Sequence, residues 1–320
     1  MMTIDHIAVV GAGAWGTALA LAAHRAGRRV TLWGRDVTEM AARRENVAHL
    51  PGVALPEPMR ITGRIADVVS ADAILLATPA QTVREVAGHL GAIAEDTPVV
   101  LCAKGLERGT ARRMSEVLSE ALPPAAPVVL SGPSFASEVA QGAPTALVAA
   151  STEAEAVRAV QDEFRASYFR LYGSDDVVGV EVGGALKNVI AIAAGVVEGL
   201  GLGHNALAAL VTRGLAEVSR LACAMGGHRD TMAGLSGLGD LVLTCTGSLS
   251  RNHHVGIELG RGRSLEAIVG SMRMVAEGIR TTTAALALGE RYGVELPIAA
   301  QMADVLAGQR TPREALECLM

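Results

Sequence analysis

The sequence predicts a two-domain chain, in which an α/β domain with a doubly wound parallel sheet precedes a domain made of helices alone. A buried strand, a glycine-rich turn and a helix follow one another between His6 and Gly27. Strands then alternate with helices. From about Val177 onward, the apolar residues recur at helical spacing instead. A chain of 320 residues is long for one domain and comfortable for two. We place the boundary near Gly179, which gives domains of residues 1–179 and 180–320.

Composition narrows the classes of function. The net charge is −5, and aromatic residues make up only 2% of the chain. With no basic stripe and no aromatic platform, we expect no nucleic-acid partner. The longest strictly apolar run in the central helix, Val189 to Val197, is too short to span a bilayer, and the N-terminus lacks a signal-peptide pattern, so we expect no stable membrane insertion. The four cysteines form no C-x-x-C pair and no metal spacing, which indicates reduced thiols in the cytoplasm.

A glycine-rich turn follows the first strand. The run GAGAWG, Gly11 to Gly16, stands between the strand His6 to Val10 and the helix Thr17 to Gly27. This order is the context that a dinucleotide fingerprint requires, because the helix N-terminus then offers free N–H groups to a pyrophosphate. The first glycine permits a tight turn, Gly13 lets a ligand approach, and the third lets helix and strand pack closely. The pattern predicts a Rossmann-like domain, with a plain glycine turn as the alternative.

The end of the second strand, Arg28 to Trp33, bears on cofactor choice. NAD-selective sites usually have an acidic residue here, whereas this chain has Gly34, Arg35 and Asp36. Arg35 can pair with a 2′-phosphate, which favours NADP(H); the alternative is an exposed surface charge. Asp36 is expected to cap the helix that follows.

Later turns are expected at the carboxyl ends of further strands, where ligands bind in open parallel sheets. Ala48 to Glu57 is expected to be a loop because prolines and glycines interrupt it. The turn at Thr78 to Ala80 and Lys104 each follow a strand. The segment from Val128 to Ala150 is predicted to hold a strand, the turn Ser131 to Ala136, and another strand. The alternative for this turn is an ordinary one with a helix cap at Ser134.

A single lysine stands in a long apolar stretch, Gly184 to Asn205, which is expected to be a buried helix. This prediction puts Lys187 in the first helical turn, where burial and the helix dipole both disfavour its charge. Such a lysine either forms a structural ion pair or keeps a lowered pKa for proton transfer, and the stretch alone leaves both open. The glycines of the stretch let a backbone or a ligand come close.

A second dense motif runs from Ala233 to Gly262. Asp240 is expected to follow a flexible glycine-rich turn, and Ser250, Arg251 and Asn252 to open a helix. A planar guanidinium, a hydroxyl, an amide and a helix N-terminus together suit a phosphate. The alternative is an N-cap followed by an exposed arginine.

These motifs together resemble a known family. The run from Gly184 to Asn205 closely resembles the signature of bacterial-type NAD(P)-dependent glycerol-3-phosphate dehydrogenases. The turn G-P-S-F-A, the pattern L-x-G-x-G-D-L-x-x-T-C with the later S-R-N, and V-A-E-G resemble the same family in the same order. The resemblance extends from Gly11 to about Pro297. His49 and His254 depart from it, since an aromatic residue and an arginine are usual there.

The resemblance implies a reaction, with Lys187 as its general acid/base. The reaction is the reversible reduction of dihydroxyacetone phosphate to sn-glycerol 3-phosphate by NADPH or NADH, feeding glycerophospholipid synthesis, in a cleft between the domains of a cytoplasmic homodimer. Implied substrate contacts are Lys104, Gly132, Ser134, Lys187, Asp240, Ser250, Arg251 and Asn252. Implied contacts to NADP(H) or NAD(H) are Gly11, Gly13, Ala14, Trp15, Gly16, Arg35, Lys104, Ala136, Arg251, Val275 and Glu277. We expect no metal, because adjacent histidines on a helix, His253 and His254, face different ways.

Two other functions fit the same architecture. One is a β-hydroxyacid or ketopantoate-type dehydrogenase with a lysine on a similar helix, against which the S-R-N cluster argues. The other is a non-catalytic NADP(H)-binding regulator, which has no use for Lys187.

Overall fold

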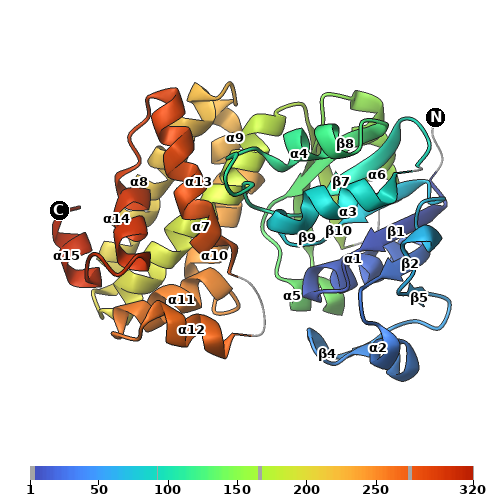
Figure 1. Ribbon diagram of the computed structural model, residues 1–320, viewed down its shortest axis with the longest axis horizontal. Coiled ribbons are helices and arrows are strands. Elements are labelled where there is room, and N and C mark those ends of the chain that lie inside the picture. Colours follow the sequence, from blue (N-terminus) through green and yellow to red (C-terminus); the bar gives the residue numbers. More distant parts are fainter. Residues whose placement is uncertain (1–3, 92, 165–167, 273–275, 320) are drawn as a thin grey trace. The chain divides into compact units, whose positions relative to one another are not determined.

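The computed structural model describes residues 4–91, 93–164, 168–272 and 276–319 (Figure 1). The chain forms two compact units. One combines Met1–Ala103 with Met114–Val177, and the other combines Lys104–Arg113 with Val178–Met320. The sequence places residues 104–113 in the first domain, but they pack with the helices of the second. Two buried apolar residues, Leu106 and Ala111, explain this, because they belong to the core of the helical unit.

The first unit is built on an eight-stranded sheet with the order β10-β9-β8-β7-β6-β1-β2-β5. Its strands are β1 (His6–Val10), β2 (Arg29–Trp33), β5 (Arg60–Thr62), β6 (Ala73–Leu76), β7 (Thr97–Leu101), β8 (Ala125–Ser131), β9 (Thr145–Ala150) and β10 (Phe169–Ser174). Its helices are α1 (Ala14–Arg25), α2 (Thr38–Arg43), α3 (Val83–Leu90), α4 (Met114–Ala121), α5 (Ala136–Gln141) and α6 (Ala154–Glu163), with the short 3-10 turns η1 (Ile65–Asp67) and η2 (Ala80–Thr82).

The doubly wound parallel sheet is confirmed, with a variation at one edge. Strands β1, β2, β5, β6, β7 and β8 run parallel, while β9 pairs antiparallel with β8 and parallel with β10. The central strands are continuous runs of buried apolar residues, as is usual for strands covered on both faces. The carboxyl ends of the parallel strands β1, β2, β6, β7 and β8 therefore lie along one side of the sheet.

Three local predictions in this unit are wrong. The segment expected to be a loop forms a small antiparallel pair, β3 (Glu45–Asn46) and β4 (Leu50–Ala54). Asp36 does not cap α2 as predicted; its carboxylate accepts from the N–H of Thr38 at 3.4 Å, and the residue before the helix is Val37. A helix, α5, stands between β8 and β9 where only a turn was expected. Nor does the structure show the helix cap of the alternative, because the hydroxyl of Ser134 donates to the carbonyl oxygen of Gly132 at 3.2 Å.

Apart from residues 104–113, the regular secondary structure in the described part of the second unit is helical, as predicted. Its helices are α7 (Val177–Gly199), α8 (Gly203–Ala224), α9 (Arg229–Ala233), α10 (Asp240–Thr246), α11 (Arg251–Gly260), α12 (Leu265–Ser271), α13 (Glu277–Tyr292), α14 (Pro297–Leu306) and α15 (Pro312–Glu317), with a π-helical stretch η3 (Leu235–Gly239).

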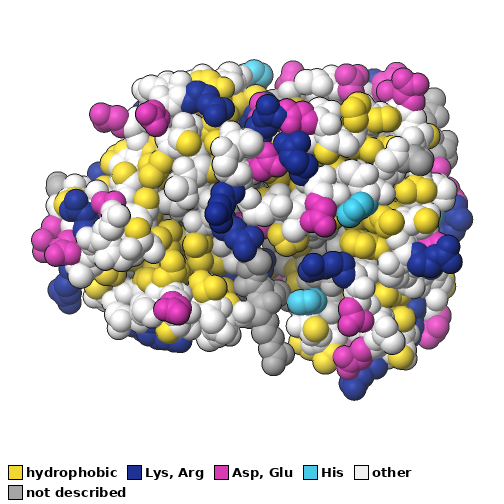
Figure 2. Space-filling view, in the orientation of Figure 1, with side chains coloured by type: hydrophobic (Ala, Val, Ile, Leu, Met, Phe, Trp, Pro, Cys, Tyr) yellow, Lys and Arg dark blue, Asp and Glu magenta, His cyan; other side chains and the backbone are white. Residues whose placement is uncertain are grey.

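Helix α7 is the core of this unit, but its bounds differ from the prediction. It begins at Val177, upstream of Gly184, and ends at Gly199, where Gly201 at φ +71° breaks the helix before α8. The residues from Gly179 to Val197 are all buried. Among the described helices, only α7 is long and apolar enough to cross a membrane. Its most apolar stretch of 18 residues is 89% buried inside the protein, as in the core helix of a globular unit. Figure 2 shows side chains of both charges interspersed over the face in view.

The glycines of α7 serve close contact with another helix. A Cβ atom on Gly195 would overlap the carbonyl oxygen of His253 in α11, and one on Gly256 of α11 would overlap that of Ile192 in α7. Gly199 meets the carbonyl oxygen of Ile257 in the same way. The sequence allowed either a backbone or a ligand to come close to these glycines, and the structure shows that another backbone does. This contact packs α11 closely against the C-terminal part of α7.

We expect Gly256→Ala to destabilise the protein by about 1–3 kcal/mol, because the added methyl group overpacks the contact between α7 and α11. Gly270→Ala is the matched control. This glycine lies in α12, and no atom of the described residues lies within 4 Å of its Cβ position, so alanine there should be neutral or stabilising by up to about 1 kcal/mol. Thermal and urea unfolding of both variants measure the difference, and equal stabilities would refute the packing role.

Candidate active site

A buried lysine–aspartate pair forms the centre of the helical unit. The ammonium group of Lys187 donates to Asp240 Oδ1 at 2.5 Å and to Thr244 Oγ1 at 2.9 Å. Lys187 is 7% exposed and Asp240 1%. The ion pair that the sequence left open is therefore present, and its lysine is held by both a carboxylate and a hydroxyl.

A second lysine contacts the same carboxylate. Lys104 Nζ donates to Asp240 Oδ2 at 2.6 Å, and its side chain is 16% exposed. The two oxygens of Asp240 thus each hold one ammonium group. A single buried carboxylate carries one negative charge against two positive ones, so the cluster has an excess positive charge, suited to an anionic group.

The electrostatics of the cluster lower the proton affinity of Lys187. Burial disfavours its charged form most, Asp240 opposes this, and the positive charge of Lys104 adds to it, so its pKa falls from 10.5 to about 8. Burial alone would raise the pKa of Asp240, but the two ammonium groups outweigh burial and hold it below its usual value. The predicted contribution of the helix dipole is wrong. Lys187 lies well inside α7, and the dipole acts only within the first turn.

Asp240 is placed by helical structure and not by the flexible turn that was predicted. The π-helical stretch η3 runs directly into α10, whose first residue is Asp240. Thr244 is one turn further along α10, so it lies on the same face and reaches the same ammonium group. Sequence reasoning missed Thr244; its signal was the i, i+4 spacing from Asp240.

A chain of side-chain amides adjoins the lysines. Asn188 Nδ2 donates to the carbonyl oxygen of Lys104 at 3.0 Å. Asn188 Oδ1 accepts from Asn252 Nδ2 at 3.0 Å, and Asn252 Oδ1 accepts from the N–H of Gly278 at 2.9 Å. Asn188, also missed by sequence reasoning, thus joins Lys104 to the starts of α11 and α13.

At the start of α11, the local geometry is that of the alternative in which a helix N-cap is followed by an exposed arginine. Ser250 is the N-cap, and its hydroxyl accepts from the N–H of His253 at 3.2 Å. Arg251 is exposed, whereas Asn252 is buried. Since Asn252 bonds to Gly278, the preceding residues Arg251 and Glu277 are brought together at two helix starts. Val275 lies outside the described residues.

The two adjacent histidines of α11 do face different ways. His253 is buried, with Nε2 3.3 Å from Glu198 Oε2, while His254 is exposed.

The buried thiol of Cys245, whose pKa burial raises to about 12, stays protonated beside the lysine cluster. All four cysteines are free thiols.

In the sheet unit, the glycine turn has the geometry expected of a dinucleotide site. Gly11 has φ +121°, and a Cβ atom there would meet the carbonyl oxygen of Ala77 at 2.6 Å; a Cβ atom on Gly16 would overlap Gly11. The protein's own packing therefore explains these two glycines. No atom of the described residues lies within 4 Å of the Cβ position of Gly13, which leaves room for a ligand to approach. Ala14 and Trp15 open α1, whose N-terminal N–H groups suit a phosphate.

Other predicted cofactor residues lie at the carboxyl ends of neighbouring strands. Arg35 is exposed two residues after β2. Gly132, at φ +132°, follows β8, and Ala136 opens α5. The buried hydroxyl of Thr78, after β6, has no hydrogen-bond partner among the described residues. These features fit a dinucleotide at this edge.

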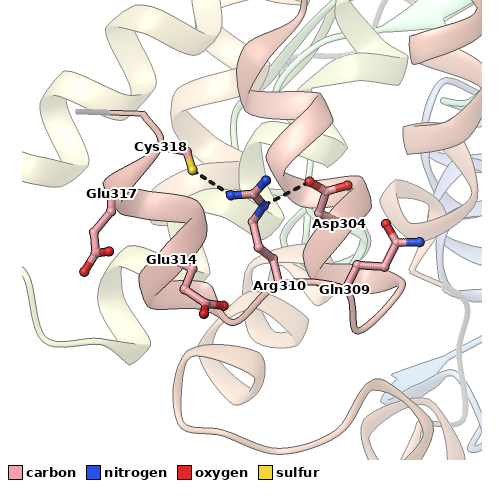
Figure 3. Close-up of a pocket in the computed structure, with 6 residues that line it drawn as sticks. All are labelled: Asp304, Gln309, Arg310, Glu314, Glu317 and Cys318. Atoms are coloured by element: carbon pink, nitrogen blue, oxygen red, sulfur yellow. Dashed lines mark hydrogen bonds and ion pairs between the residues drawn. The ribbon is translucent and has the colours of Figure 1, made fainter.

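A hollow of the helical unit lies elsewhere. It has a volume of about 500 Å³ and is lined by Asp304, Gln309, Arg310, Glu314, Glu317 and Cys318. Figure 3 shows Arg310 between Asp304 and Cys318, with its guanidinium held by both. None of these residues belongs to the lysine cluster. We assign the chemistry to the cluster because it holds the buried lysine with a pKa shifted towards neutrality.

Comparison with known proteins agrees with this geometry. Residues 6–157 and 176–317 match the models of the NAD-dependent glycerol-3-phosphate dehydrogenase N-terminus and C-terminus. Glycerol-3-phosphate dehydrogenases [NAD(P)+] of Rhodospirillum rubrum and Koribacter versatilis are 49% and 50% identical, over 99% of this chain and 92% and 97% of theirs. The crystal structure of the Coxiella burnetii glycerol-3-phosphate dehydrogenase is 37% identical, with a TM-score of 0.95 over 100% of this chain and 99% of that one. The chain therefore belongs to the NAD-dependent glycerol-3-phosphate dehydrogenase family.

Proposed function

We propose that this enzyme reduces dihydroxyacetone phosphate reversibly to sn-glycerol 3-phosphate with NADPH or NADH, and that Lys187 is its general acid/base. The observation that carries the proposal is the buried Lys187, bonded to Asp240 and Thr244 and neighboured by Lys104. A lysine with a pKa of about 8 is close to ideal for proton transfer near neutral pH. The names of the relatives supply the substrate.

The chain's residues divide the chemistry in the following way. The nicotinamide cofactor supplies the hydride. Lys187 gives a proton to the carbonyl oxygen during reduction and takes one from the hydroxyl during oxidation. Asp240 orients Lys187 and balances part of the positive charge, while Lys104 lowers its proton affinity and stabilises developing negative charge on oxygen.

We assign the phosphate of the substrate to the start of α11. The guanidinium of Arg251 stands beside the N–H groups of a helix N-terminus, a combination that suits a dianion. Ser250 contributes mainly as the cap of this helix. The amide of Asn252 is engaged with Asn188 and Gly278, so we assign it to holding the site together as well as to bordering the phosphate.

We assign the cofactor to the carboxyl edge of the sheet, at Gly11, Gly13, Ala14, Trp15 and Gly16. Lys104, Ala136 and Glu277 complete the proposed cofactor contacts, while Gly132 and Ser134 are assigned to the substrate. We place the enzyme in the cytoplasm, feeding glycerophospholipid synthesis, and expect a homodimer, in line with its family. The free thiols agree with a reducing compartment.

One assay tests the proposal. NADPH oxidation should be rapid with dihydroxyacetone phosphate and poor with dihydroxyacetone. Turnover of non-phosphorylated hydroxy acids in preference would favour the ketopantoate-type alternative. Cofactor binding without turnover of any of these substrates would favour a regulator.

The two directions of the reaction should depend on pH in opposite ways. Oxidation of glycerol 3-phosphate needs neutral Lys187, so kcat/KM should rise through a midpoint near pH 8. Reduction needs the ammonium form, so its kcat/KM should fall above the same pH. Between pH 8 and 10.5 the folded state binds fewer protons at this group than the unfolded state, so its contribution to the free energy of unfolding rises with pH. Profiles that move in the same direction would contradict the role of Lys187.

We expect NADPH to bind more tightly than NADH, and Arg35→Ala to narrow the ratio of the two dissociation constants. Arg35 stands after β2, where NAD-selective sites place an acid. Fluorescence titration of both cofactors measures the ratio. An unchanged ratio in the variant would show that Arg35 does not contact a 2′-phosphate.

A further inference from the structure

Lys104 reaches the active site on a short segment, Lys104–Arg113, that is attached to α7 at both ends. At the first end, the side-chain amide of Asn188 donates to the carbonyl oxygen of Lys104 at 3.0 Å. At the other end, Arg113 Nη1 donates to Glu181 Oε2 at 2.9 Å. We call this segment the Lys104 strap.

Both anchors lie on the helix that carries Lys187. Glu181 and Asn188 are separated by about two helical turns, so they share one face of α7. Asn188 directly follows Lys187 in the sequence. One rigid helix therefore fixes Lys187 and also the two ends of the strap that delivers the second ammonium group.

The anchors are withdrawn from solvent. The side chains of Arg113 and Glu181 are 16% and 5% exposed, so their attraction is weakly screened. Between the anchors, the strap is closed on itself by a bridge between Leu106 and Arg113, and Leu106 is completely buried. The strap is thus seated in the helical unit through Leu106 and Ala111, while residues 108–110 are exposed.

The polarity of the first anchor is fixed by two backbone groups. The carbonyl of Lys104 can only accept, so Asn188 must turn its NH₂ group towards it and its oxygen towards Asn252. The N–H of Gly278 can only donate, so Asn252 must turn its oxygen to α13. This chain of hydrogen bonds needs an amide at both positions, since an aspartate at position 188 offers no donor when ionised.

We propose that Arg113, Glu181 and Asn188 are positioning residues that hold the ammonium group of Lys104 on Asp240, next to Lys187. This inference rests on the proposed function, because it assigns the three residues to the same proton-transfer site. It explains why a loop that leaves the sheet is packed in the helical unit. The spacing of Lys104, Lys187 and Asp240 is then set inside that one unit.

The test is the double variant Arg113→Gln/Glu181→Gln, which removes both charges and leaves neither one buried without its partner. We expect kcat to fall by ~10-fold or more, since small misplacements of catalytic groups are costly. The midpoint of the pH profile for oxidation should move upward, because the positive charge of Lys104 is no longer held beside Lys187. Arg113→Lys keeps the charge and should recover part of kcat.

The strap's action through Lys104 is tested by coupling. In a Lys104→Ala background, the two glutamine substitutions should cause no further loss of kcat. Asn188→Asp should lower kcat and be equally masked. Neutralising a different ion pair of the same unit, with Arg310→Gln/Asp304→Asn, should leave kcat and the pH midpoint unchanged.

The outcomes separate this inference from the proposed function. Wild-type enzyme that does not reduce dihydroxyacetone phosphate contradicts the function. The strap is also followed without turnover, by amide hydrogen exchange of residues 104–113, which should accelerate in the double variant. Unchanged exchange, a loss of kcat that adds fully to that of Lys104→Ala, or a lowered melting temperature with unchanged kcat and pH midpoint would overturn the positioning role.

Discussion

Replacing Lys187 by alanine is expected to lower turnover of dihydroxyacetone phosphate by at least ~100-fold, the usual scale for a lost general acid. The variant keeps Asp240 paired with Lys104, so no unpaired charge is left in the core. Cofactor affinity should change little, because the glycine turn and α1 belong to the sheet unit. Steady-state kinetics and NADPH titration together measure the two effects.

Two companion measurements show whether proton transfer is what has been lost. Lys187→Arg keeps a positive charge, but arginine does not release its proton at these pH values, so oxidation of glycerol 3-phosphate should remain at least ~100-fold slower. A small primary amine added to Lys187→Ala should restore part of the activity. Near-normal turnover in Lys187→Ala would refute the assignment, as would normal oxidation by Lys187→Arg.

The fold was predictable where the pattern is local and repeated. Strand β1 has the predicted bounds, and the glycine turn stands between β1 and α1 as expected. Such strands can be recognised in the sequence because burial on both faces requires continuous apolar residues. The short α5 and the β3–β4 pair escaped prediction, since neither has enough residues for a period to show.

The candidate site was predictable by residue more than by geometry. Lys187, Asp240 and Lys104 were each singled out, and the structure brings them together. The physical cause predicted for the lowered pKa of Lys187 was partly wrong. Because α7 starts at Val177, Lys187 lies beyond the first helical turn and the helix dipole does not act on its charge. Asp176 directly precedes Val177 and is a helix-start signal that the prediction did not use. Thr244 and Asn188 were missed because their roles depend on contacts between helices that are distant in sequence.

Arg251→Ala is expected to raise the KM for dihydroxyacetone phosphate by about 10- to 100-fold. A charge-assisted hydrogen bond contributes ~1.5–3 kcal/mol, and each 1.4 kcal/mol corresponds to about tenfold in affinity. Arg251→Lys keeps the charge and loses the planar fork, so it should weaken binding less, though measurably. Because Arg251 is exposed at the first position of α11, neither change should disturb the helix. Steady-state kinetics over a range of substrate concentrations give both values.

The comparison with dihydroxyacetone distinguishes a phosphate contact from a defect of the fold. Activity on this unphosphorylated substrate, poor from the start, should barely fall in Arg251→Ala, whereas a misfolded site would lose both activities alike. Arg261→Ala is the matched control. This exposed arginine stands at the far end of α11, beside Glu258, and its loss should leave both substrates unaffected. Equal losses on both substrates in Arg251→Ala, at an unchanged melting temperature, would assign Arg251 to the cofactor instead. The phosphate would then fall to Lys104 and the N–H groups at the start of α11.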